Sequence, residues 1–90
     1  MKMKFLIVED SKRAQEAALE FFAAEGIEVE FAASVEEVEQ MMLVDAHKYH
    51  AVVTSDYMSY ALNGKEEGFY GEFIALQADK FGLPSVIFCI

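Results

Sequence analysis

Near its amino terminus the sequence reads Phe5-Leu6-Ile7-Val8-Glu9-Asp10-Ser11, an apolar run that ends at two acidic residues. A short, nearly continuous apolar run with β-branched members is typical of a strand buried on both faces, and we expect this one to span residues 3–8. A second run, Ala51-Val52-Val53-Thr54, ends in the same way at Ser55-Asp56. The two runs predict two interior strands, each followed by acidic side chains.

The segment between these runs predicts a helix, a strand and a second helix. Apolar residues at helical spacing indicate a helix over residues 11–25, which should end at Gly26. Apolar residues alternate with glutamates over residues 27–31, which favours a strand with one wet face near a sheet edge. Ser34-Val35-Glu36-Glu37 is a capping box in which Ser34 and Glu37 should each bind the other's amide, beginning a helix that ends near residue 46.

The third strand run is followed by fourteen residues, 57–70, with no clear period and with turn markers at Asn63-Gly64 and Gly68. This is longer than most connections in a compact α/β unit, so we expect an insertion here. Its aromatic residues indicate either a recognition surface or a lid over the strand ends. Helical character returns over residues 71–81, and an apolar run over residues 85–90 predicts a fourth strand.

The predicted order βαβαβαβ is typical of a parallel sheet covered on both faces. The last run is as apolar as a central strand, yet it ends the 90-residue sequence. An edge strand leaves amides and carbonyls unpaired and is a template for pairing with another chain. Either a fifth strand lies outside these residues, or a partner chain covers the edge, which makes a homo-oligomer through the fourth-strand edge possible.

Composition narrows the class of protein. Ninety residues allow one small domain, and a hydrophobic fraction of 54% is enough to bury a core. A net charge of −9 disfavours nucleic acid and anionic membranes as partners. A single cysteine, Cys89, fits a reducing compartment, and no apolar run is long enough for a signal peptide or a membrane span. We therefore expect a cytoplasmic domain.

Three acidic side chains should meet at one rim of the sheet. Ligands bind open parallel sheets at the carboxyl ends of the strands, where Glu9, Asp10 and Asp56 lie. Three oxygen donors suit Mg²⁺, which would also relieve their mutual repulsion. With the metal offsetting charge on the transferring oxygens, Asp56 can act as a nucleophile toward a phosphoryl donor.

These residues carry a resemblance to a known family. The two apolar runs that end at acidic residues resemble, in order and spacing, the first and third strands of the receiver domain of bacterial response regulators. The fourth strand of that domain is resembled by Leu83-Pro84-Ser85-Val86-Ile87-Phe88-Cys89. The resemblance implies a flavodoxin-like, three-layer α/β/α fold with a parallel sheet of strand order 2-1-3-4. It also implies that residues 1–90 form one receiver-like domain that lacks the family's last helix-strand-helix, the fifth strand included.

The resemblance further implies a signalling function rather than a turnover enzyme. Glu9, Asp10 and Asp56 would hold Mg²⁺, and Asp56 would accept a phosphoryl group from a histidine kinase or phosphotransfer protein in a two-component phosphorelay and pass the change to a downstream protein target. Cys89 occupies the place where the family usually has Thr or Ser, Ile90 stands where a small residue commonly follows, and the family's lysine and proline have no counterparts. These departures favour the alternative of a pseudo-receiver, an interaction module that is not phosphorylated.

Each candidate residue also has a purely structural interpretation. Glu9 and Asp10 can be solvated acids, with Asp10 capping the first helix. Asp56 can simply begin a turn. His47 and His50 precede the third strand at the end of the sheet opposite the acids, so they are interpreted as surface residues. Cys89 is interpreted as a buried apolar side chain, because no basic neighbour lowers its pKa.

Overall fold

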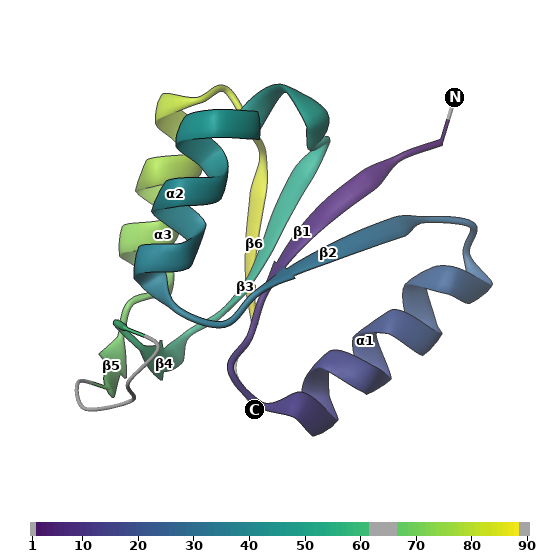
Figure 1. Ribbon diagram of the computed structural model, residues 1–90, viewed down its shortest axis with the longest axis horizontal. Coiled ribbons are helices and arrows are strands. Elements are labelled where there is room, and N and C mark those ends of the chain that lie inside the picture. The colour runs from purple at the N-terminus through teal and green to yellow at the C-terminus, as the bar shows by residue number, and fades with distance from the viewer. Residues whose placement is uncertain (1, 62–66, 89–90) are drawn as a thin grey trace.

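The computed structural model describes residues 2–61 and 67–88 and has three layers, with helix α1 on one face of a parallel sheet and helices α2 and α3 on the other (Figure 1). The strands of this sheet are β1 (Lys4–Val8), β2 (Glu28–Ala32), β3 (Ala51–Ser55) and β6 (Ser85–Phe88). The helices are α1 (Lys12–Ala24), α2 (Val35–Asp45), α3 (Gly71–Lys80) and the short 3-10 helix η1 (Ala46–Lys48). The three-layer α/β prediction is confirmed.

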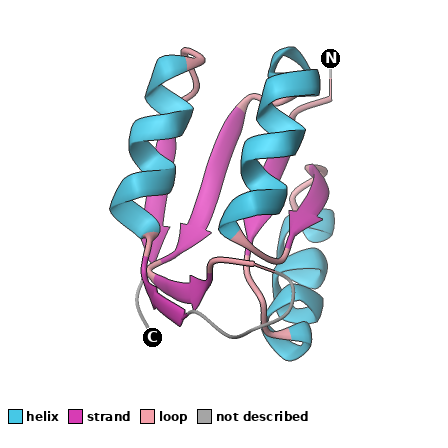
Figure 2. Cartoon of the chain, turned by 60° about the vertical axis from the view of Figure 1, so that its left-hand side comes forward, coloured by secondary structure: helices cyan, strands magenta, loops and turns pink. Residues whose placement is uncertain are grey.

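The sheet has the order β2-β1-β3-β6, and every neighbouring pair is parallel. This confirms the predicted order, in which the first strand lies between the second and the third. Val8 pairs with Thr54, so β1 and β3 leave the sheet side by side at the same rim. Figure 2 shows the strand arrowheads pointing toward this carboxyl rim. The topology therefore brings the backbone after β1 next to the backbone after β3.

Serine side chains begin the first two helices. The Ser11 hydroxyl accepts from the Ala14 amide at 3.3 Å, so the N-cap of α1 is Ser11, and the alternative that Asp10 caps this helix is wrong. Ser34 caps α2 as predicted, but the Glu37 carboxylate accepts from the Ala33 amide at 2.9 Å rather than from that of Ser34. Within residues 2–61 and 67–88, no helix has the length and apolar character needed to cross a bilayer.

The hydrophobic core lies between the sheet and the two helices α2 and α3. Fully buried apolar side chains from β1, β3 and both helices form it, with Leu6, Val38, Met42, Val52 and Ile74 among the largest. The other face of the sheet is covered by α1, which has no buried residue of its own. Burial of apolar surface is the main force holding such layers together, so α2 and α3 fix the sheet more firmly than α1 does.

The insertion between β3 and α3 contains a β-hairpin, where the sequence indicated no regular structure. Strands β4 (Tyr57–Ser59) and β5 (Glu67–Phe69) pair antiparallel at the carboxyl rim of the main sheet (Figure 2). Met58 in β4 is fully buried and belongs to the hydrophobic core, whereas the rings of Tyr57 and Phe69 stack edge to face with centroids 5.0 Å apart on the outside. Met58 therefore anchors the hairpin to the hydrophobic core.

Strand β6 forms an edge of the main sheet. Among the described residues it pairs with β3 alone, and it exposes Val86 by 59% and Ile87 by 38%. Cys89 and the end of the predicted fourth strand lie outside the described residues. Exposed apolar side chains on an edge strand favour pairing with another chain. The expectation of a partner at this edge stays a prediction.

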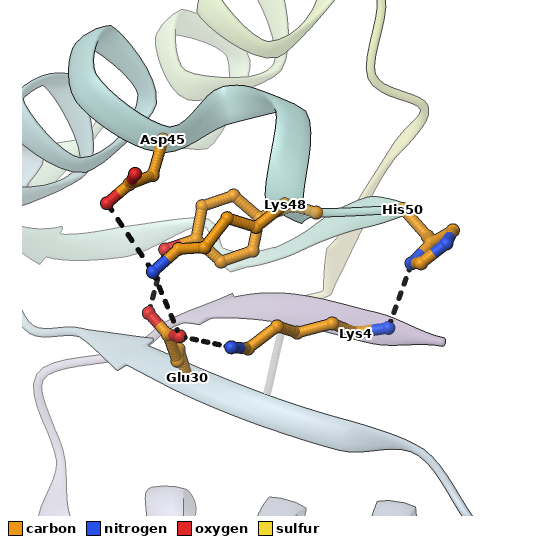
Figure 3. Close-up of polar contacts among 6 residues, drawn as sticks. Lys4, Glu30, Asp45, Lys48 and His50 are labelled. Carbon is orange, nitrogen blue, oxygen red and sulfur yellow. Dashed lines mark hydrogen bonds and ion pairs between the residues drawn. The ribbon is translucent and has the colours of Figure 1, made fainter. Parts of the chain in front are cut away.

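A polar network joins the start of β1 and the segment just before β3 to Glu30 in β2 (Figure 3). The Glu30 carboxylate binds the Lys4 ammonium at 2.6 Å and the Lys48 ammonium at 3.5 Å, and the buried Tyr49 hydroxyl donates to it at 2.8 Å. The Lys4 hydrogen bond holds the pKa of Glu30 below its usual value. His50 accepts at Nδ1 from the Lys4 amide at 3.0 Å, so it serves this structural network.

Candidate functional site

The predicted site residues follow the neighbouring strands β1 and β3 at the carboxyl rim. Glu9 and Asp10 come directly after β1, and Asp56 separates β3 from β4. Backbone hydrogen bonds hold both positions, since the Glu9 amide donates to the Ala32 carbonyl at 2.9 Å and the Asp56 amide donates to the Phe88 carbonyl at 3.1 Å. The sheet thus fixes the main chain of the residues that the sequence singled out.

Glu9 is buried, although a carboxylate at a strand end is normally solvated. The residue is only 4% exposed, and its Oε1 accepts a hydrogen bond from the Ser11 amide at 3.1 Å. The second oxygen, Oε2, is buried and accepts no hydrogen bond within the described part of the chain. Burial raises the pKa of Glu9, and the neighbouring Asp10 carboxyl raises it further. The charged form of Glu9 therefore carries a desolvation cost.

Asp10 is exposed but bound to the inserted hairpin. Its Oδ2 accepts two hydrogen bonds from Ser59, from the amide at 3.0 Å and from the hydroxyl at 3.1 Å. Ser59 itself is 7% exposed and lies 49 residues away in sequence. A surface pocket opens beside this contact, lined by Asp10, Ala33, Ser59, Ala61 and Glu67. The hairpin thus orients Asp10, with one carboxylate oxygen held by protein donors.

Asp56 is half-buried and lies against the first residue of α3. The Gly71 amide donates to the Asp56 carbonyl at 3.2 Å, which joins the start of α3 to the end of β3. Asp56 Oδ1 is only 2.8 Å from the point where a Cβ on residue 71 would stand. The Asp56 carboxylate therefore faces the amino end of α3, which is the end of a helix dipole that favours a negative group.

The three carboxyl groups lie at one rim without forming a ready metal site. Across residues 2–61 and 67–88, no group of three or more His, Cys, Asp and Glu side chains is placed to hold a metal ion. Asp10 is directed to Ser59, and Asp56 Oδ1 is packed close to Gly71. Metal binding by Glu9, Asp10 and Asp56 stays a prediction, and it needs these side chains to turn toward one another.

We expect Glu9→Gln to stabilise the fold at neutral pH by about 1 kcal/mol, because it removes a buried carboxylate whose Oε2 accepts no hydrogen bond from residues 2–61 and 67–88. Since the pKa of Glu9 is raised in the folded state, its carboxyl group contributes stability at low pH that is lost as the pH rises through that folded pKa. The gain should therefore shrink toward pH 4. Urea unfolding across this pH range measures it.

The matched control for this substitution is Glu16→Gln, which makes the same charge change at an exposed position of α1. Exposed substitutions of this kind usually change stability by less than about 0.5 kcal/mol. Equal free energies of unfolding for the two variants at pH 7 would show that Glu9 carries no buried-charge penalty.

Two residues of this rim were not singled out from the sequence. Ser59 contacts Asp10 through a hairpin whose two strands of three residues are too short to show alternation. Gly71 was recognised only as the beginning of a helix, although a glycine beside a predicted site can mark a close approach of the backbone. The sequence therefore placed the acids, and the structure adds the groups that orient them.

Comparison with known proteins supports the fold. No protein-family model matches the chain, and no curated protein sequence matches it. Among solved structures it is similar to a response regulator receiver protein from Pseudomonas putida, with a TM-score of 0.71 and 19% sequence identity over 99% of this chain and 69% of that chain. At this identity the likeness concerns the fold, and the chain has the flavodoxin-like fold of a receiver domain.

Proposed function

We propose that the chain is a phosphoacceptor receiver domain of a two-component phosphorelay, with Asp56 as the acceptor. The observation that carries this proposal is the position of a half-buried Asp56 at the end of β3, on the rim where the buried Glu9 follows β1. In an open parallel sheet this rim is where ligands bind. The receiver-like fold supports the same position.

Phosphoryl transfer to Asp56 requires the chain mainly to position the carboxylate and to stabilise negative charge. An oxygen of the Asp56 carboxylate attacks the phosphorus of the donor, a new O–P bond forms, and the bond from phosphorus to the leaving group breaks, with its electron pair going to the leaving group. Such transfers depend mainly on positioning and on electrostatic stabilisation of the phosphoryl oxygens. The amino end of α3, beside Asp56, favours the added negative charge.

Mg²⁺ is the cofactor that fits these side chains. The buried Oε2 of Glu9 has no hydrogen-bond partner among the residues that the structure describes, and burial makes the charged carboxylate costly. A divalent cation bound to this oxygen would lower that cost. Glu9, Asp10 and Asp56 are the residues that would hold it. When bound, the metal supplies charge neutralisation for the transferring phosphoryl oxygens.

The proposal includes the partners that this chemistry requires. The donor is a histidine kinase or a phosphotransfer protein, and the output is contact with a downstream protein target in the cytoplasm. The domain changes state once for each phosphoryl group that it receives, so its role is that of a switch and not of an enzyme with turnover on a free substrate.

Two observations favour a second candidate function, that of a pseudo-receiver. Asp10 already receives two hydrogen bonds from Ser59, and the carboxyl groups are not assembled as a metal site among the described residues. A receiver fold held permanently in one state by its hairpin would act as a protein-binding module without phosphorylation. The exposed Tyr57 and Phe69 rings of the hairpin would then be part of its contact surface.

Exposure to acetyl phosphate and Mg²⁺ distinguishes the two functions. A receiver is expected to gain the mass of one phosphoryl group, and beryllofluoride with Mg²⁺ should shift amide signals at the carboxyl rim. Both responses should disappear when the metal is chelated. A folded sample that shows neither response under these conditions would leave the pseudo-receiver as the function.

A further inference from the structure

The first residue of α3 is in unusually close contact with the end of β3. A Cβ built on Gly71 would lie 2.8 Å from Asp56 Oδ1, 2.9 Å from Ile87 Cγ2 and 3.0 Å from Asp56 Cα. Real Cβ atoms essentially never approach a neighbour more closely than 3.0 Å. Gly71 is fully enclosed at this point, and its main-chain conformation does not require a glycine, since its φ is not positive. Its lack of a side chain is therefore explained by space alone.

The three close atoms differ in how easily they move. Asp56 Cα is held by the backbone hydrogen bonds to Phe88 and Gly71, and Ile87 is held in the ladder of β6 with β3. The Asp56 carboxylate is the softest of the three, because it rotates about its own side-chain torsions. A side chain at residue 71 would therefore act first on the Asp56 carboxylate.

We propose that Gly71 is a positioning residue for Asp56. Because residue 71 has no side chain, the amino end of α3 lies directly against the Asp56 carboxylate. This close contact fixes the direction in which the carboxylate oxygens point. This inference rests on the proposed phosphoacceptor function and deepens it. Gly71 touches no reacting group of the donor, and it acts through the orientation of Asp56.

The test compares Gly71→Ala with the unsubstituted chain, using acetyl phosphate as donor and Mg²⁺ as cofactor. We expect the rate of phosphorylation at saturating acetyl phosphate to fall by about tenfold or more, because small displacements of a reacting group have effects of this size. The donor concentration at half-saturation should change little. The carboxyl carbon signal of Asp56 in the resting protein, measured by NMR, should move as well.

A second pair of variants separates orientation from packing. Ile87→Ala removes Cγ2 and hence one of the three close contacts, at a residue that is already 38% exposed. We expect Ile87→Ala alone to react at the normal rate and Gly71→Ala/Ile87→Ala to remain slow. If Gly71→Ala alone fails to fold, the double variant, in which α3 has room to settle against β6, carries the comparison with Ile87→Ala.

The outcomes are distinct. A slow Gly71→Ala with a shifted Asp56 carboxyl signal supports the inference. If the double variant regains the normal rate, or if Gly71→Ala reacts as fast as the unsubstituted chain, the positioning role is refuted while the phosphoacceptor function stands. If the unsubstituted chain takes up no phosphoryl group, the proposed function fails, and the inference fails with it.

Discussion

Asp56→Asn is expected to abolish the uptake of a phosphoryl group completely. An amide oxygen is a far poorer nucleophile than a carboxylate, and the substitution keeps the size of the side chain, so the fold should survive. The backbone contacts of residue 56 with Phe88 and Gly71 are main-chain hydrogen bonds that the change leaves intact. Intact mass after incubation with acetyl phosphate and Mg²⁺ measures the effect.

The matched control is Asp79→Asn, at an exposed position near the end of α3. It makes the same chemical change away from the carboxyl rim, and we expect it to react at the normal rate. If Asp56→Asn still gained the mass of a phosphoryl group, another side chain would be the acceptor. Peptide mapping would then show whether Glu9 or Asp10 carries it.

The second large effect is expected from Met58→Ala, which removes the side chain that attaches the hairpin to the core. Met58 is fully buried, and replacing such a residue by alanine costs about 2–5 kcal/mol of stability. An isolated two-stranded hairpin is at best marginally stable in water, so β4 and β5 should separate from the rim. The Ser59 amide, which is bound to Asp10, should then exchange its hydrogen much faster.

Urea unfolding and hydrogen exchange measure these effects together. Met3→Ala is the matched control, because Met3 is 46% exposed and its truncation should change stability by less than about 0.5 kcal/mol. Equal unfolding midpoints for the two methionine variants would mean that the hairpin is held by something other than Met58. Unchanged protection of the Ser59 amide would mean the same.

The main sheet and its helices were largely predictable, because each element is long enough to show its own pattern. The continuous apolar runs of β1 and β3 and the Ser34 cap of α2 are local signals, whereas for α1 the sequence suggested Asp10 as the cap and the structure has Ser11. The capping box at the start of α2 was predicted with the correct residues, but Glu37 binds the Ala33 amide and not the predicted Ser34 amide. Which amide Glu37 binds depends on the backbone conformation just before α2.

The hairpin was not predictable, because its strands are too short to show a pattern of their own. Its strands of three residues carry too little periodicity, and its attachment depends on Met58 reaching a core formed by distant elements. The length of residues 57–70 and their lack of a clear period indicated an insertion, and their aromatic residues indicated a recognition surface or a lid, but none of these features predicted a hairpin. Short strands of this kind become ordered through tertiary contacts, which a single sequence does not display.

The candidate site was predictable in position and not in orientation. Strand ends and charge placed Glu9, Asp10 and Asp56 at one rim, and the parallel register of β1 with β3 confirms that placement of the main chain. The burial of Glu9 could not be foreseen, because acidic residues are almost never fully buried. The contact between Asp10 and Ser59 joins residues 49 positions apart, and such pairs follow from the fold rather than from local sequence.

The aromatic residues of the hairpin give the domain a built-in optical probe. The chain has four tyrosines and no tryptophan, so tyrosine dominates its emission and its near-ultraviolet dichroism. Tyr57, Tyr60 and Tyr70 lie in or next to the hairpin, and the rings of Tyr60 and Tyr70 meet edge to face with centroids 5.4 Å apart. Spectra of the unlabelled protein should therefore follow events at the carboxyl rim directly, and kinetic work on this domain can begin without a fluorophore or a tag.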